Sequence, residues 1–351
     1  KRLGKQTVTE VDEFQHNLVT TTTNYYSSTD YDYPTAVVVV DSKSNYDSIT
    51  YKRSPEFVST GNVYDKMKQQ NMLQPVIEQV AYSNATKLST LKNNYRDWFN
   101  NQKVIALDSV QASIFSNGLE TRLRYYGYDT YNNPLSMGKD KDRPTSYLWG
   151  YNNARPVAQV TNAGSSSIAY TSFETSETGG WSGISGAGLT NSGSLTGRRA
   201  LTKNNFSISK SGLGTTTSYI ISYWSKNGSY TVNTTSGTAG WTVNGWTFYS
   251  HTVTPSSGTV TVTGSGSIDE LRLYPAALSQ MTTYTYNPMG GVTSICDPNS
   301  RILYYEYDEL QRPVLIRDQD RNIVKKFSYN YNGVTEYPGI YYNTAQTVFR
   351  Y

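Results

Sequence analysis

The chain is patterned mainly as short runs of alternating or β-branched residues separated by turn-forming residues. In the first third such runs stand at 20–26, 36–40, 75–82, 104–107 and 119–126, between clusters of Ser, Asn and Asp. Runs of this kind, bounded by turn residues, are typical of strands. Residues 63–73 differ because their composition is helical and Asn62 is placed to cap a first turn. Residues 1–124 are therefore predicted to be mostly β, with one short helix near 63–73.

A tyrosine phrase recurs towards the end of the chain. It reads Tyr-Thr-Tyr-Asn at 284–287, Tyr-Glu-Tyr-Asp at 305–308 and Tyr-Asn-Tyr-Asn at 329–332. The period is about 21 to 22 residues if the last phrase is aligned on Tyr329-Asn330, and about 24 if it is aligned on the second Tyr; both indicate a stacked repeat. Tyrosines two residues apart share one face of a strand. Apolar runs follow at 292–295 and 314–316, so each unit is predicted to be a β-hairpin.

The same phrase starts earlier, at 126–129 and 147–152, breaks off after Val160 and resumes at Tyr284. Residues 125–163 and 277–351 are therefore predicted to be two halves of one hairpin array. The block between them, 164–276, is rich in glycine and holds four of the six tryptophans. Its strand-like runs at 218–224, 230–233, 246–253 and 259–263 predict an inserted β-sandwich. The fold class is all-β: a hairpin array, curved into a sheet or shell, interrupted by a sandwich.

Composition narrows the function. Among 351 residues, 32 Tyr against 9 Phe suit strands with one wet face, because a Tyr ring packs while its hydroxyl reaches water. The net charge of +4 has no basic block, which argues against nucleic acid as a partner. One cysteine excludes an intramolecular disulfide. The apolar runs are too short to span a membrane. The chain begins and ends in mid-pattern, so we expect it to be a piece of a longer polypeptide.

The segment at 307–314, Tyr-Asp-Glu-Leu-Gln-Arg-Pro-Val, resembles the YD repeat of bacterial RHS proteins and of the related teneurin shells. Gln311 departs from the Gly of that pattern, which predicts another turn type there. The resemblance implies a structural shell or scaffold, secreted or on the cell surface at the outer membrane, of Bacteroidota type. It implies that the shell projects the inserted sandwich outward. It also implies that the shell encloses a toxin or presents an adhesin. The implied partners are the rest of the same polypeptide and the outer-membrane export machinery.

The inserted block resembles the jelly-roll sandwiches of carbohydrate-binding modules. The likeness rests on Ser-Phe-Glu at 172–174 as its opening strand, Gly-Trp at 180–181, the run 194–201 as second strand and Ile-Asp-Glu-Leu-Arg-Leu at 268–273 as last strand. In such modules a first-strand Glu and a last-strand Asp share a structural calcium ion, a cation that prefers oxygen ligands. Glu174 and Asp269 occupy those positions. The alternative is that both acids face water or Arg272. No cofactor beyond this calcium is implied.

Exposed aromatic rings are how such modules hold sugars. The candidates are Trp181, Trp224, Trp241, Trp246 and Tyr249, with core packing as the alternative for each. Trp241 follows Gly240 in a glycine-rich stretch and is expected to be the most exposed of these residues. Trp181, Trp241 and Tyr249 form the candidate glycan site.

Catalytic chemistry finds no support. The two histidines, His16 and His251, lack a nucleophile motif nearby, and His251 is expected to be a surface or satisfied core side chain. Asp297 and Asp318 are expected to bond their own backbone two residues on, as Asp does in turns. Two hypotheses remain: a non-enzymatic structural shell, and a glycan-binding protein acting through the inserted sandwich.

Overall fold

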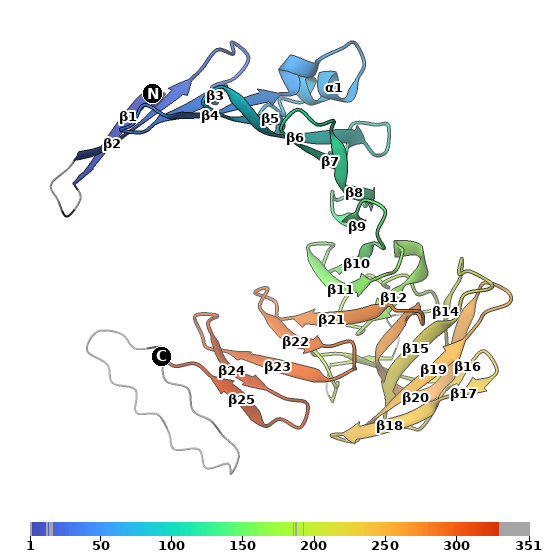
Figure 1. Ribbon diagram of the computed structural model, residues 1–351. Coiled ribbons are helices and arrows are strands. Elements are labelled where there is room, and N and C mark those ends of the chain that lie inside the picture. The colour runs from blue at the N-terminus through green and yellow to red at the C-terminus, as the bar shows by residue number, and fades with distance from the viewer. Residues whose placement is uncertain are drawn as a thin grey trace. The chain divides into compact units, whose positions relative to one another are not determined.

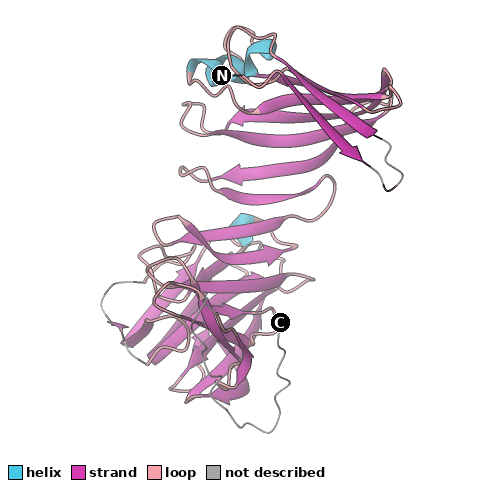
Figure 2. Cartoon of the chain, turned by 90° about the vertical axis from the view of Figure 1, so that its left-hand side faces the viewer, coloured by secondary structure: helices cyan, strands magenta, loops and turns pink. Residues whose placement is uncertain are grey.

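The computed structural model describes residues 2–11, 13, 17–184, 186, 188–191 and 193–329. Nearly all of its regular structure is antiparallel strand, as predicted (Figure 2). The chain divides into two compact units, Lys1–Arg143 and Pro144–Tyr351, which are described separately. His16 and the phrase end at 331–332 lie outside the described residues.

The first unit is a sheet in which each strand pairs antiparallel with the next in sequence (Figure 1). Its strands are β1 (Lys5–Val11), β2 (Asn17–Tyr25), β3 (Ala36–Val40), β4 (Tyr46–Arg53), β5 (Val76–Ser83), β6 (Thr86–Asp97), β7 (Ile105–Ile114), β8 (Glu120–Tyr128) and β9 (Pro134–Lys139). The five predicted runs match β2, β3, β5, β7 and β8. The boundary predicted after residue 124 is wrong, because β8 crosses it without a break and the units divide between Arg143 and Pro144.

The predicted helix is present but shorter than expected. Helix α1 (Val63–Gln69) follows a 3-10 turn, η1 (Ser54–Phe57), and starts at Asn62, whose Oδ1 accepts the N–H of Asp65 at 2.8 Å. It ends early because Asn71 takes a left-handed backbone, φ 58°, and the N–H of Met72 returns to the carbonyl of Met67. Met67 is fully buried with Ile77, which ties α1 to the sheet.

The second unit contains a meander of hairpins interrupted by a separate domain. The hairpin strands are β10 (Thr145–Gly150), β11 (Arg155–Thr161), β21 (Gln280–Tyr286), β22 (Val292–Cys296), β23 (Ile302–Tyr307), β24 (Pro313–Arg317) and β25 (Ile323–Lys326). Strand β11 pairs directly with β21, with Ala158 opposite Thr283. The hairpins before and after residues 162–279 therefore pair directly with each other.

The inserted domain, residues 164–276, is all β and folds around one apolar core. Its elements are η2 (Ser165–Ser167), β12 (Ala169–Thr171), β13 (Leu189–Thr190), β14 (Ala200–Lys210), β15 (Tyr219–Ser225), β16 (Thr231–Val232), β17 (Thr235–Ser236), β18 (Thr238–Val243), β19 (Trp246–Val253) and β20 (Val260–Pro275). Strand β20 is the hub, since it pairs with β12, β14, β15 and β16.

Three strand predictions in this domain are wrong. The segment 172–174 follows β12 instead of forming the opening strand, and 194–199 is a loop that precedes β14. The runs 259–263 and 268–273 are not separate strands but parts of β20. Gly264 and Gly266 lie inside β20 where it pairs with β14, and Gly266 has φ 129°.

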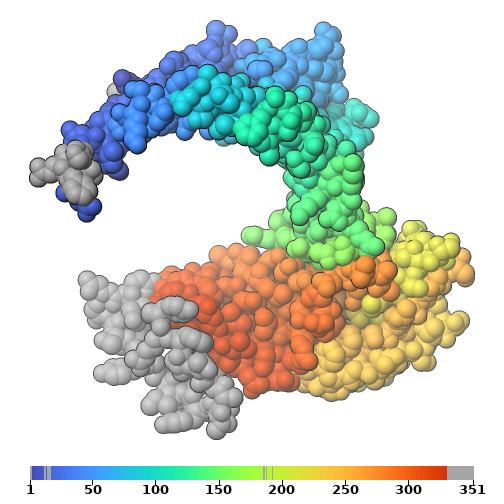
Figure 3. Space-filling view, in the orientation of Figure 1, coloured from blue at the N-terminus to red at the C-terminus, as the bar shows by residue number. Residues whose placement is uncertain are grey.

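The inserted domain packs directly against the hairpins. Trp224 and Trp246 from the domain share a buried cluster with Cys296, Ile302 and Tyr304 from the hairpins. In the space-filling view the two parts of this unit meet without a visible gap (Figure 3). In the part of the chain that the structure describes, we find no helix with the length and apolar character needed to span a bilayer.

Candidate functional site

Six hairpin turns in the part of the chain that the structure describes are built on one design. In four of them an Asp Oδ1 accepts the backbone N–H groups of the residues two and four positions on, at 2.9–3.0 Å; these are Asp41, Asp129, Asp308 and Asp318. Asn287 and Asp297 accept the N–H four positions on, at 2.9 and 2.8 Å. In all six the residue three positions on has a positive φ, between 60° and 93°. The Asp or Asn at the start of each turn therefore anchors the whole loop.

The turn at 308–312 belongs to this same class, so the prediction of a different type at Gln311 is wrong. Gln311 has φ 60°, in the left-handed region where Gly290 has φ 93° in the preceding repeat. Asp308 holds the turn closed, with Arg312 pairing with its carboxylate. The carboxylate anchor thus replaces the glycine. The predicted bond from Asp318 to the backbone two residues on is confirmed at 3.0 Å.

The repeated tyrosines form a hydroxyl seam between neighbouring strands. The Oη of Tyr286 donates to the carbonyl of Pro156 at 2.8 Å, that of Tyr307 to Val292 at 2.9 Å, and that of Tyr329 to Pro313 at 2.9 Å. For Tyr286 and Tyr307 the acceptor lies at or next to the start of the strand that pairs with the Tyr's own strand. For Tyr329 the acceptor begins β24, which pairs with β25, the strand that precedes this Tyr. The contacts also settle the alignment of the last phrase, because Tyr329 takes the place of Tyr307.

The inserted domain docks on the hairpins through the buried side chain of Arg272, which pairs with Glu270 of its own strand. Glu270 and Arg272 of β20 are 2% and 1% exposed. Arg272 donates through Nη1 to the carbonyl of Asp297 at 3.0 Å, and through Nη2 to that of Cys296 at 3.1 Å and to the hydroxyl of Thr283 at 2.6 Å. Its Nη2 also lies 3.3 Å from Glu270 Oε2. One guanidinium on the inserted domain thereby satisfies three groups on β21, β22 and the turn after β22.

Glu270 is placed by an irregularity in β20. The register of β15 against β20 shifts between Ser222 and Trp224, and Glu270 takes a left-handed backbone with φ 51°. Such a conformation is costly for a residue with a Cβ, so the surrounding contacts hold it there. Its carboxylate accepts from Tyr170 Oη at 2.5 Å, from Thr196 Oγ1 at 2.8 Å and from Thr283 Oγ1 at 2.8 Å.

The two acids predicted to bind calcium hold one loop, residues 194–199. Asp269 Oδ2 accepts the N–H groups of Leu195 and Thr196 at 2.9 and 3.1 Å. Glu174 Oε1 accepts those of Arg198, at 2.6 Å, and of Arg199. Burial raises the pKa of both carboxyls, and the charge of Glu270 adds to the effect at Asp269.

These contacts bear on the calcium prediction. The oxygens that would ligate the ion already accept backbone N–H groups, and no group of three or more His, Cys, Asp or Glu side chains suited to a metal ion occurs among the described residues. The donor set therefore supplies the oxygens that calcium prefers without a cluster to enclose it. The shared calcium stays a prediction.

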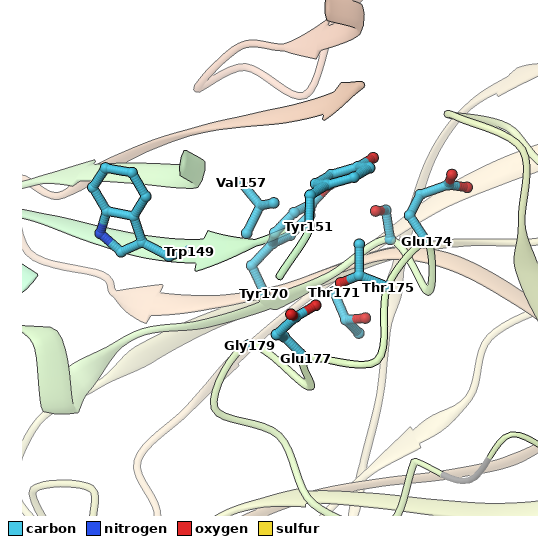
Figure 4. Close-up of a pocket in the computed structure, with 10 residues that line it drawn as sticks. Trp149, Tyr151, Val157, Tyr170, Thr171, Glu174, Thr175, Glu177 and Gly179 are labelled. Atoms are coloured by element: carbon cyan, nitrogen blue, oxygen red, sulfur yellow. The ribbon is translucent and has the colours of Figure 1, made fainter. Parts of the chain in front are cut away.

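A small pocket lies where the hairpin β10–β11 meets the start of the inserted domain (Figure 4). Trp149 and Tyr151 line it from the hairpin, and Tyr170, Glu174 and Glu177 from the inserted domain. Its volume is about 10 Å³, which is room for about one water molecule. It is too small for a sugar ring or a substrate.

The aromatic residues proposed to bind glycans are mostly packed. Trp181 is 3% exposed in the core of the inserted domain, so its place in a glycan site is wrong. Trp224 and Trp246 are also buried. Trp241 is half-buried, with its ring stacked on Phe248 at 4.9 Å and the Arg301 guanidinium 5.7 Å from its centroid.

Tyr249 and His251 are also packed against neighbouring side chains. Tyr249 is half-buried and stacks on Tyr223 at 5.8 Å. His251 is 5% exposed, and its two ring nitrogens lie 3.1 Å from the hydroxyls of Tyr223 and Thr235. It is therefore a satisfied buried histidine, one of the two alternatives expected.

Sequence reasoning missed Glu270 and the docking role of Arg272. A usable signal exists, because a strand that reads Ile-Asp-Glu-Leu-Arg-Leu places three charges among residues patterned for burial. Charged side chains are seldom fully buried unless they are paired. The paired partners on β21 and β22 are distant in sequence, so the pattern alone does not locate them.

Neither a protein-family model nor a curated protein matches the chain. Among solved structures it is similar to TcdB2-TccC3, at 9% identity and a TM-score of 0.20, over 89% of this chain and 20% of that one. It is also similar to a Photorhabdus luminescens Tc holotoxin pore, at 15% identity and a TM-score of 0.18, over 94% of this chain and 20% of that one. TcdB2-TccC3 without its hypervariable C-terminal region matches at 11% identity and a TM-score of 0.18, over 92% and 24%. The chain spans about a fifth to a quarter of the length of these structures.

Proposed function

We propose that this chain is a non-enzymatic wall section of a large bacterial RHS/YD-repeat protein, secreted or held at the cell surface. In this proposal the hairpins form the wall of the shell, and the inserted domain is rigidly attached to that wall and supports it. The observation that carries the proposal is the tyrosine seam, in which Tyr286, Tyr307 and Tyr329 repeat one hydrogen bond to a preceding strand. Repetition of one inter-strand contact is what a stacked repeat requires for stability.

The docking of the inserted domain supports a rigid wall. A domain displayed on a flexible attachment needs no buried contacts with its carrier, whereas this one buries both an ion pair and two tryptophans against the hairpins. Separation would break the bonds of Arg272 to Thr283, Cys296 and Asp297 and would expose Trp224 and Trp246 to water, so the docked arrangement is favoured. Whether the shell encloses a toxin or presents an adhesin, a stiff wall serves it.

The proposal is tested on the full-length gene product by electron cryomicroscopy. We expect residues 144–329 to appear as part of a continuous hairpin wall, with further hairpins paired to β25 and the inserted domain fixed against it. A matched variant, Tyr307→Phe, removes one seam hydroxyl and should lower the melting temperature without changing the image. Particles in which these residues form a separate bead on a flexible tether would contradict the proposal.

The glycan-binding alternative gains no specific support from the aromatic side chains of the inserted domain. Its remaining candidates, Trp241 and Tyr249, are half-buried against Phe248 and Tyr223. A glycan array probed with this chain tests it directly.

A further inference from the structure

Two connections in the first unit are longer than the hairpin design needs. The segment between β2 and β3 has 10 residues, 26–35, and the segment between β4 and β5 has 22, residues 54–75. The other connections between its strands have two to seven residues. The longer segment carries η1 and α1, so it is an ordered part of the fold. The shell function proposed above does not explain these two longer segments.

The two segments together border a groove of about 490 Å³. Six of its lining residues are Asp30, Asp32 and Tyr33 from the first segment and Asn71, Leu73 and Gln74 from the second. This volume lies within the usual range for a small-molecule site, about 300–1,000 Å³.

Arg53 fixes the walls of the groove to each other. Its side chain is 6% exposed, donates through Nη1 to the carbonyl of Pro34 at 3.0 Å and through Nε to that of Gln74 at 3.3 Å. Its guanidinium also lies 5.0 Å from the ring centroid of Tyr31 and 5.1 Å from that of Tyr33. One buried cation thus joins both segments, so the groove is formed before any ligand arrives.

The groove contains an aromatic ring and two side-chain amides that form no hydrogen bond within the described residues. Tyr33 is 40% exposed. Within the described residues, the Tyr33 hydroxyl and the side-chain amides of Asn71 and Gln74 have no hydrogen-bond partner. An amide can donate and accept at once, which suits a ligand hydroxyl that does the same.

The charges of the groove are already balanced. Asp30 pairs with Lys68 at 2.9 Å, and Asp32 pairs with Arg2. A cationic ligand would have to compete with these partners, and an anion would face two carboxylates. Leu73 is the one aliphatic side chain in the lining, so an apolar ligand gains little.

We propose that this groove binds a neutral saccharide, with a pyranose ring stacked on Tyr33 and its hydroxyls bonded to the amides of Asn71 and Gln74. A sugar matches the groove because it has an apolar ring face and uncharged hydroxyls around its edge. The site lies in the first unit and is separate from the aromatic residues of the inserted domain. It adds a ligand to the wall and does not depend on the proposed function.

The test is isothermal titration and saturation-transfer NMR on the full 351-residue chain with maltotetraose, cellotetraose, laminaritetraose and chitotetraose. We expect one of these to bind with a Kd of about 1 mM or below. Tyr33→Ala should weaken binding at least about tenfold, and Tyr33→Phe should keep most of it. Asn71→Gly should weaken binding while keeping the fold, because glycine tolerates φ 58°.

Tyr131→Ala is the matched control, since Tyr131 is 66% exposed in the β8–β9 turn and does not line the groove. It should leave the affinity unchanged. Thermal unfolding of each variant shows that the chain is folded. The proposal is overturned if none of the four sugars binds the folded wild-type chain, or if a bound sugar keeps its affinity in Tyr33→Ala. Neither result affects the proposed shell function, because the test of that function concerns residues 144–329.

Discussion

The docking of the inserted domain is best tested by replacing Arg272 with Met. Methionine keeps most of the length of the side chain and removes all of its hydrogen bonds. The change deprives Glu270 of its cationic partner, at 3.3 Å, and the carbonyls of Cys296 and Asp297 of a donor. All of these groups lose that partner without gaining access to water.

The size of the effect follows from that burial. Removing one member of a buried ion pair typically costs about 3–5 kcal/mol, because an unpaired charge is left in the interior. Glu270 keeps the hydroxyls of Tyr170, Thr196 and Thr283, which offsets part of this cost. The lost bond to the carbonyl of Cys296 adds about 1 kcal/mol, whereas the carbonyl of Asp297 keeps the N–H of Ser300 at 2.9 Å. We therefore expect the second unit to lose about 4 kcal/mol of unfolding free energy.

The assay is urea unfolding followed by tryptophan fluorescence, because Trp224 and Trp246 lie in the junction and report its opening. The double variant Glu270→Gln with Arg272→Met should recover about 2 kcal/mol, since Gln keeps the hydrogen bonds and removes the unpaired charge. Arg122→Met is the control: it breaks an exposed pair with Glu120, at 2.9 Å, and should change stability by less than about 0.5 kcal/mol.

Two results would refute this reasoning. A loss below about 1 kcal/mol for Arg272→Met would mean that apolar packing alone holds the domain in place. A double variant no more stable than the single one would mean that Glu270 and Arg272 are not coupled.

Four further outcomes follow from the turns and the buried acids and histidine. Gln311→Gly should stabilise the chain by about 0.5–1 kcal/mol in urea unfolding, because it removes a Cβ at φ 60°. Asp129→Ala should cost about 1–2 kcal/mol by the loss of two backbone bonds at 2.9 Å, whereas Asp129→Asn should keep most of the stability. Burial lowers the pKa of His251 from 6.5 to about 4, so the unfolded chain binds a proton first as pH falls. The stability that neutral His251 contributes is full above pH 6.5 and falls by about 3 kcal/mol down to pH 4, and the difference between wild type and His251→Gln in urea unfolding should shrink over that window. If calcium binds at Glu174 and Asp269, calorimetry with calcium and with chelator should give different melting temperatures, and Glu174→Gln should abolish the difference.

The hairpin array was predictable because its signals are local. Each turn is encoded within five residues, from an Asp or Asn to the position four residues on, and Tyr286 and Tyr307 lie directly before such turns. Period and pairing then follow from chain order. Even the prediction at Gln311 failed for a local reason: the Asp308 carboxylate fixes the turn, so glycine is not required at the positive φ.

The junction was not predictable because its signals are tertiary. The face that Trp181 or Trp241 presents depends on which element covers it, and the covering strands are distant in sequence. A Cβ at Gly264 would come within 2.3 Å of the Tyr230 ring. Glycine is there for close packing inside a strand, and sequence does not separate that use from a turn.

An insertion of this size leaves the array intact because the domain returns its chain to where it left. Its first and last strands, β12 and β20, pair antiparallel with Ala169 opposite Leu273, so entry and exit lie side by side. Asn162 and Ser279 then join the two linkers, through the Asn162 side chain to the carbonyl of Leu278 at 2.6 Å and the Ser279 hydroxyl to the carbonyl of Asn162 at 3.0 Å. Strands β11 and β21 therefore meet as neighbours in sequence would, and Tyr286 still reaches Pro156. The seam continues across the insertion because the entry and exit segments of the inserted domain are held together within that domain and its linkers.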